Sequence, residues 1–143
     1  MYNLRQLAGT LTDSFLPTAT RNRNFFVNAI GSDIEIGQNR EWIASVISGM
    51  LSTVVGYSRD TCIRLTAKKM DSVIIVEIQE SGSVNSYTMA CALQKIQSLA
   101  EKIGGSLHLS INKPQTTTIS FSFPNLPLVP HSEYMHYSTV LYR

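Results

Sequence analysis

The sequence predicts an α+β fold: a two-layer α/β sandwich in which a mixed, mostly antiparallel sheet of about five strands carries three helices on one face. The chain has 143 residues, 43% of them hydrophobic, which is enough for one compact core but short for two. Helix-like and strand-like periodicities alternate along it in a mixed order, and no repeat of about 20 to 50 residues is present. One domain over residues 1–127 is therefore expected.

The N-terminal part predicts a helix, a strand and a second helix. An amphipathic helix is expected over residues 3–15, ended by Pro17. The aromatic and β-branched residues 24–30 predict a strand, which begins a core domain over residues 24–124. The next helix has Asn39 as its expected N-cap residue and Gly56 as its C-terminal stop. Its apolar residues recur every three or four positions: Trp42, Ile43, Val46, Ile47, Met50, Leu51, Val54 and Val55.

Two adjacent strands follow this helix. Residues 61–67 alternate between apolar and polar side chains, as in a half-exposed strand, and residues 68–71 form the expected turn. Residues 72–78 are nearly all apolar, which is typical of a central strand. A polar break over residues 79–86 then leads into the second long helix.

The last part of the core predicts a helix and a hairpin. One face of the helix is apolar through Met89, Leu93, Ile96, Leu99, Ala100 and Ile103. Gly104 and Gly105 end the helix, and two alternating strands over 107–111 and 117–123 follow. Residues 128–143 form a C-terminal tail, whose aromatic side chains are expected to cover a sheet edge or to serve a dimer.

Charge and cysteine content exclude several classes of protein. The 12 basic and 10 acidic residues are scattered, with Lys68-Lys69 as the one adjacent basic pair, so a nucleic-acid partner is not expected. Cys62 and Cys91 have neither metal-site spacing nor disulfide-scaffold density, and we expect buried free thiols in a reducing cytosol. The chain shows no signal peptide and no apolar run of about 20 residues. We therefore expect a cytoplasmic protein without a membrane span.

No residue pattern predicts catalysis or a metal site. His108 falls on the solvent side of its predicted strand, while His131 and His136 lie in the tail. Glu77 and Glu80 are interpreted as solvated carboxylates rather than as a general acid/base pair. Neither a P-loop nor a G-x-G-x-x-G turn is present.

Four segments, in order and at compatible spacings, resemble motifs of the GHKL superfamily, the ATP-binding domain of sensor histidine kinases, anti-sigma-factor kinases and gyrase-type topoisomerases. They cover the start of the N-box helix, the strand entering the D-x-G-x-G motif, the helix end written E-L-x-G-G and the closing G-T-x-F-x-F-x-L-P strand. These segments are Asn39–Ile47, Ser72–Ile78, Leu99–Gly105 and Thr117–Pro124. The resemblance runs from about Asn24 to Pro124 and implies a histidine-kinase-type ATPase (Bergerat) fold.

The resemblance also assigns the nucleotide-contacting positions, and this sequence departs from the family at nearly all of them. In the N-box, N-x-x-x-N supplies the amide oxygen that coordinates magnesium, and the matching residues are Gly49 and Thr53. In D-x-G-x-G the carboxylate accepts from the adenine amino group, and the corresponding residues are Glu80, Gly82 and Val84. A hydroxyl is a poorer ligand for a hard cation than an amide oxygen, and a β-branched residue restricts the backbone.

The glycine motif that cradles phosphate aligns with Ala90 and Ala92, and alanine does not permit the backbone angles and close approach that glycine does. Between Val84 and Ala90 the chain is too short for the family's ATP lid. The resemblance therefore implies that the phosphate cradle is lost.

Together these observations predict a degenerate histidine-kinase-type ATPase domain that has lost ATP binding and acts as a regulatory or protein-interaction module in bacterial signal transduction. ATP and magnesium are then not expected as cofactors, the expected partner is a protein of a signalling pathway such as a two-component system, and a homodimer remains open. The helix over 3–15 carries no histidine, so autophosphorylation within this chain is not expected.

Two alternatives remain open. The domain could bind ATP through divergent contacts, with Glu80 holding adenine and Thr53 helping to bind magnesium; it would then serve a sensor histidine kinase or an anti-sigma-factor-type kinase, an ATP-dependent protein histidine or serine kinase. Alternatively, the vacated cleft between the helix of Trp42 and the helix of Met89 could serve as a small-molecule sensor.

Overall fold

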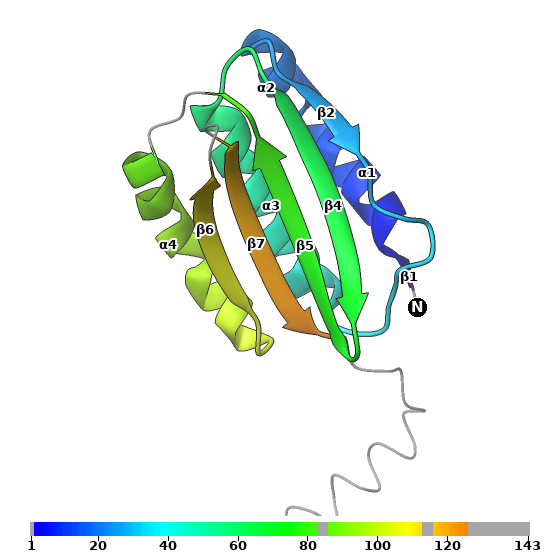
Figure 1. Ribbon diagram of the computed structural model, residues 1–143. Coiled ribbons are helices and arrows are strands. Elements are labelled where there is room, and N and C mark those ends of the chain that lie inside the picture. The colour runs from blue at the N-terminus through cyan, green and yellow to red at the C-terminus, as the bar shows by residue number, and fades with distance from the viewer. Residues whose placement is uncertain (1, 83–85, 113–115, 126–143) are drawn as a thin grey trace, which may run out of the picture.

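A five-stranded mixed sheet forms one layer of the protein, in the strand order β2-β4-β5-β7-β6 (Figure 1). The computed structural model describes residues 2–82, 86–112 and 116–125. Only β2 and β4 run parallel, and the other neighbours are antiparallel. The strands are β2 (Phe25–Asn28), β4 (Cys62–Met70), β5 (Val73–Glu80), β6 (Ser106–Asn112) and β7 (Thr116–Pro124). The predicted α+β class is confirmed.

The helices form the second layer, and Figure 1 shows them behind the sheet. Besides the three expected helices there is a short one, α2, and a small separate sheet in which β1 pairs antiparallel with β3. The helices are α1 (Leu4–Ser14), α2 (Leu16–Arg21), α3 (Arg40–Tyr57) and α4 (Ser86–Lys102). The two short strands are β1 (Tyr2–Asn3) and β3 (Glu35–Ile36).

The core lies between the two layers. Alternate residues of β5 and β7 are fully buried against the helices, as the strand periodicity predicts. These residues are Ile74, Val76, Ile78, Ile119, Phe121 and Phe123. The helix α3 buries seven of its eight predicted core residues. Trp42 is the exception: it is 42% exposed, with Lys102 Nζ 5.1 Å from the centroid of its ring.

Two predicted helix boundaries, at Pro17 and Gly56, are corrected, whereas Asn39 occupies its predicted N-cap position. Pro17 does not end the helical region but lies in the first turn of α2. Proline is tolerated there because the N–H groups of the first turn have no carbonyl partner within the helix. Asn39 precedes α3 with a φ of 62°, and its side chain makes no capping bond. In that left-handed conformation its carbonyl still accepts from the Ile43 amide at 2.9 Å. Gly56 lies within α3, which ends at Tyr57.

Two strands extend further along the chain than predicted. Lys68, Lys69 and Met70 extend β4 instead of forming the turn, which Asp71 takes with a φ of 57°. The strand β5 continues past Ile78 to Glu80. The predicted helix end at Gly104 is confirmed, with a φ of 75°. Pairing of all of β6 with residues 116–122 of β7 confirms the C-terminal hairpin.

Two further predictions concern single side chains, and a third concerns the tail. His108 is exposed, as its place in the strand predicts. Both cysteines are free, but Cys91 is exposed and Cys62 is only half-buried, so the prediction of buried thiols is wrong. Cys91 lies on the side of α4 that faces solvent, which helical periodicity permits. The predicted tail over 128–143 lies outside the described residues, as do His131, His136 and Val84.

Candidate functional site

The residues predicted to contact nucleotide occupy three separate places in the structure. Glu80 and Gly82 lie where β5 ends, in a buried polar cluster. Gly49, Thr53 and Ala92 line one groove between α3 and α4. Ala90 lines a different cavity, on the flank of α4 that faces β6.

Glu80 is buried, which corrects the prediction of a solvated carboxylate. Its side chain is 1% exposed. Because β5 runs two residues past its predicted end, the strand alternation places Glu80 on the same interior face as Val76 and Ile78. In the sheet Glu80 lies opposite Ile63 of β4 and Thr117 of β7. The row of buried apolar side chains on the interior face of β5 thus ends in a titratable side chain.

The carboxyl group of Glu80 has polar neighbours but no well-formed hydrogen bond. Neither carboxyl oxygen, nor the buried Ser58 hydroxyl, has a hydrogen-bond partner among the described residues. A Cβ added to Gly82 would lie 3.1 Å from Glu80 Oε2 and 3.5 Å from Thr61 Cβ, so a side chain at position 82 would crowd the carboxyl group. Burial raises the pKa of Glu80 above its ordinary value of 4.5, and the nearby Ser58 hydroxyl and Gly82 amide oppose the rise only in part. In its protonated form the group donates as well as accepts.

Two buried asparagines hold the end of α3 beside this cluster. Asn22 Nδ2 donates to the Val55 carbonyl at 2.9 Å, and Asn24 Nδ2 donates to the Ser58 carbonyl at 2.9 Å. Asn24 Oδ1 accepts from the Thr61 amide at 3.3 Å. These bonds satisfy carbonyls that the last turn of a helix leaves free. Sequence reasoning missed both residues, because the carbonyls that they bind lie 33 and 34 residues further along the chain.

The two positions predicted to match the N-box, Gly49 and Thr53, lie one turn apart on α3, and neither has a side-chain amide. A Cβ on Gly49 would lie 2.7 Å from Ile96 Cγ2, because α4 packs directly against the helix backbone at this point. The Thr53 hydroxyl donates to the Gly49 carbonyl at 2.8 Å. Its proton is therefore used within the helix.

Ala90 and Ala92 lie inside a regular helix. Since α4 begins at Ser86, the backbone N–H groups from Ala90 onward are at helix-interior positions, where they bond to carbonyls four residues earlier. Such amides are not available to surround a phosphate. The strand β5 ends at Glu80, so only residues 81–85 join it to α4.

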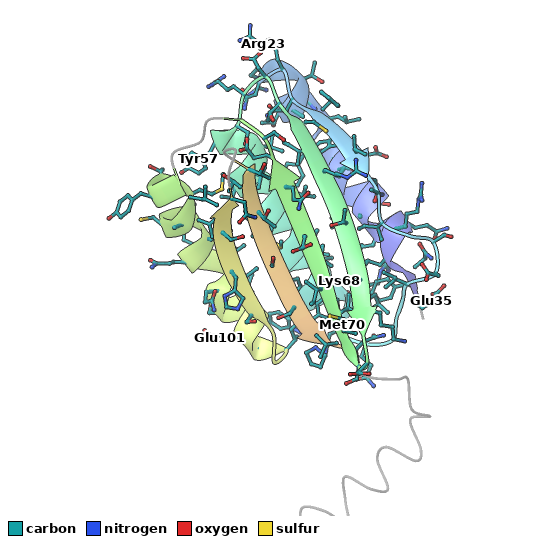
Figure 2. The ribbon with its side chains drawn as sticks, in the orientation of Figure 1. Arg23, Glu35, Tyr57, Lys68, Met70 and Glu101 are labelled. Carbon is teal, nitrogen blue, oxygen red and sulfur yellow. The ribbon has the colours of Figure 1, made fainter. Side chains whose placement is uncertain are left out.

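A groove of about 540 Å³ separates α3 from α4. Its polar groups come from Ser52, Thr53 and Tyr57 of α3 and from Lys95 of α4. Figure 2 shows Tyr57 at the C-terminal end of α3, near the start of α4. A second groove of about 540 Å³ lies between α1 and α3 and shares Gly49 and Ser52 with the first. The helix layer thus has a hollowed outer surface on both sides of α3.

The described part of the chain holds no group of three or more His, Cys, Asp and Glu residues that could bind a metal ion. Within the same residues, no helix combines the length and the apolar character that crossing a membrane requires.

The sequence matches no protein-family model and no curated protein, whereas the structure matches those of histidine kinases. The Acinetobacter baumannii histidine kinase AdeS has a TM-score of 0.74 at 11% identity, over 87% of this chain and 66% of that one. Full-length ShkA in complex with AMPPNP has a TM-score of 0.76 at 14% identity, over 90% of this chain and 31% of that one. The nucleotide-free catalytic domain of histidine kinase ThkA has a TM-score of 0.71 at 16% identity, over 87% of this chain and 93% of that one.

The shares of each chain that are covered show which part of a histidine kinase this chain resembles. This chain spans nearly the whole ThkA catalytic domain but less than two thirds of the ShkA chain. At such low identities the similarity concerns the fold alone. The chain therefore has the histidine-kinase ATPase-like fold, with the topology of a kinase catalytic domain.

Proposed function

We propose that this chain is a degenerate histidine-kinase-type ATPase domain that has lost ATP binding and acts as a regulatory, protein-interaction module in bacterial signalling. The observation that carries the proposal is the contact between Ile96 and the backbone of α3 at Gly49. It fills the space next to the position from which an N-box amide would reach magnesium.

The rest of the phosphate end supports the same proposal. Magnesium prefers oxygen ligands in strict octahedral geometry, and of the two matched positions only Thr53 has a side-chain oxygen, a neutral hydroxyl that is a poorer ligand than an amide oxygen. The helical amides at Ala90 and Ala92 are unsuited to a phosphate loop. A nucleotide would therefore meet few of the groups that hold its triphosphate in the resembling family.

The proposed partner is a protein of a signalling pathway. ThkA has been solved in complex with the response regulator protein TrrA, so a protein of that class is the first one to test with this chain. We place the module in the cytoplasm, as the QseC match is to the cytoplasmic segment of that kinase. The scattered basic residues do not favour nucleic acid.

Isothermal titration calorimetry with magnesium-ATP tests the loss of nucleotide binding. We expect no binding heat and no rise in melting temperature, since only a ligand that binds the folded state stabilises it. The Glu80→Ala variant is the control, because heat that persists in it does not come from the nucleotide site. Micromolar binding that this variant abolishes would overturn the proposal.

The second candidate is an ATP-binding domain with divergent contacts, favoured by the buried carboxyl of Glu80 next to Gly82. Here Glu80 would hold the adenine amino group. It predicts that magnesium-ATP raises the melting temperature of the unmodified protein and not that of Glu80→Ala. No rise in the unmodified protein excludes it.

The third candidate is a small-molecule sensor, favoured by the groove between α3 and α4. Of the described residues that line this groove, only Lys95 is charged, so an anionic ligand is the class to screen. A hit that stabilises the unmodified protein but not Lys95→Ala would support this role, and a screen of anionic metabolites without hits would count against it.

A further inference from the structure

We propose that the sheet edge at β6, together with the adjacent flank of α4, binds an extended, uncharged peptide segment of a partner protein by strand addition. This inference rests on the protein-interaction role proposed above and names its surface and the chemistry of its partner. It involves neither the groove between α3 and α4 nor the polar cluster around Glu80.

The strand β6 is an open edge of the sheet. Among the described residues it pairs only with β7, so every second residue directs its backbone N–H and C=O away from the sheet. It is 7 residues long, whereas β2 at the opposite edge has only 4. Edge strands are commonly protected by charged side chains or proline, and Ser106–Asn112 contains neither lysine, arginine, acid nor proline. This edge is thus a template for another strand.

An apolar cavity of about 130 Å³ lies beside that edge. None of the described residues that line it is an acid, a lysine or an arginine. The lining residues are Ala90, Leu93, Gln94 and Gln97 of α4 and Leu107, His108 and Leu109 of β6. Because an apolar cavity of about 150 Å³ can hold benzene, this one is large enough for one aliphatic side chain. An edge strand flanked by a helix with an apolar pocket is the arrangement that strand-adding peptide-binding domains use.

The register of β6 determines which residues of the peptide would touch the protein. Leu107, Leu109 and Ile111 share the face that carries the cavity, and Ile111 is 55% exposed. Residues opposite one another in adjacent strands have Cβ atoms about 5 Å apart. An added strand would therefore place one apolar side chain in the cavity and a second, two residues away, against Ile111. The intervening side chain would lie on the sheet face of His108 and Ser110, which is polar.

The test uses synthetic peptides of about eight residues, an ordinary strand length, with two aliphatic residues separated by one threonine. They are added to the isotopically labelled full chain, and backbone amide shifts are followed by NMR. We expect the largest shifts in β6 and in the first half of α4. Shifts confined to the α1–α3 or α3–α4 groove would overturn the proposal.

N-methylation of the peptide separates strand addition from simple apolar binding. Methyl groups on alternate amides face β6 in one set and solvent in the other. We expect binding to be lost in one set only. Equal affinities for the two sets would overturn the proposal, as would β6 shifts caused only by a peptide that copies residues 134–143, since the occupant would then be this chain's own C-terminal segment.

A pair of matched variants tests the edge itself. Ile111→Lys places a charge beside the expected second contact, and we expect at least about tenfold weaker peptide binding. Phe25→Lys makes the same kind of change at the opposite edge, where Phe25 is 60% exposed, and should leave binding within about twofold. Equal effects of the two would refute the β6 location. ATP binding is measured separately, so failure here leaves the proposed loss of nucleotide binding unaffected.

Discussion

The two ends of the candidate site, one around Glu80 and the other around Gly49, contain different kinds of groups. At the end of β5, the carboxyl of Glu80 remains inside the protein beside Ser58 and Gly82. At the end that the family resemblance assigns to phosphate, an aliphatic side chain, Ile96, packs against the bare backbone of Gly49. One end thus has polar groups in the core, and the other consists of apolar packing between two helices.

This difference shows which changes a fold tolerates without rearrangement. A glycine on the surface of a helix allows a second helix to approach its backbone, and the apolar contact then stabilises the folded state. A buried carboxyl without a good hydrogen bond instead lowers stability. The asparagines that hold the end of α3 offset part of that cost, because they satisfy backbone groups around the cluster.

The largest effect is expected from Asn24→Ala, which removes the bonds to the Ser58 carbonyl and the Thr61 amide. Both groups are in the interior, so we expect a loss of about 3 kcal/mol of unfolding free energy in urea denaturation. The exposed Asn112→Ala is the matched control and should change stability by less than about 0.5 kcal/mol. If the two substitutions lowered the unfolding free energy equally, Asn24 would have no special role in holding the polar cluster around Glu80.

The next largest effect is expected at the contact between Gly49 and Ile96. Gly49→Asn restores the side chain of the resembling family, but its Cβ would meet Ile96 at 2.7 Å. We expect a loss of about 2 kcal/mol from overpacking, measured by thermal or urea unfolding. Gly56→Asn in the same helix is the control, because a Cβ there has open space. If Gly49→Asn were as stable as Gly56→Asn, the two helices would not be in contact at this point.

Glu80→Gln should act in the opposite direction, raising stability at neutral pH by about 1 kcal/mol. The folded pKa of Glu80 is raised, so its contribution to stability is fully present below about 4.5, the ordinary value, and is lost as the pH rises through the folded pKa. Glutamine cannot ionise and should remove this part of the pH dependence. Unfolding measured across this pH range checks the prediction, and parallel profiles for both proteins would contradict it.

The smallest effect is expected from Thr53→Val. The hydroxyl bonds only to a carbonyl of its own helix among the described residues, so stability should change by less than about 0.5 kcal/mol. Titration with magnesium-ATP should also be unchanged. A loss of magnesium-dependent binding in this variant would instead favour the ATP-binding alternative.

Periodicity predicted most of the fold correctly. The apolar spacing of α3 and the alternation of β5 to β7 are local patterns, and local patterns identify helices, strands and their buried faces. Boundaries were less predictable. Pro17 fits equally well after one helix or in the first turn of another, and the sequence does not distinguish the two.

The sequence by itself determined the α+β class, the order of the core elements and the absence of amide side chains at positions 49 and 53. Only the tertiary structure decided that Glu80 is buried, that Ile96 fills the space beside Gly49, and that Ala90 and Ala92 face different cavities. The physical reason is that burial and contact between α3, α4 and β5 depend on where distant segments meet. Local propensity reports only which face of each element is apolar.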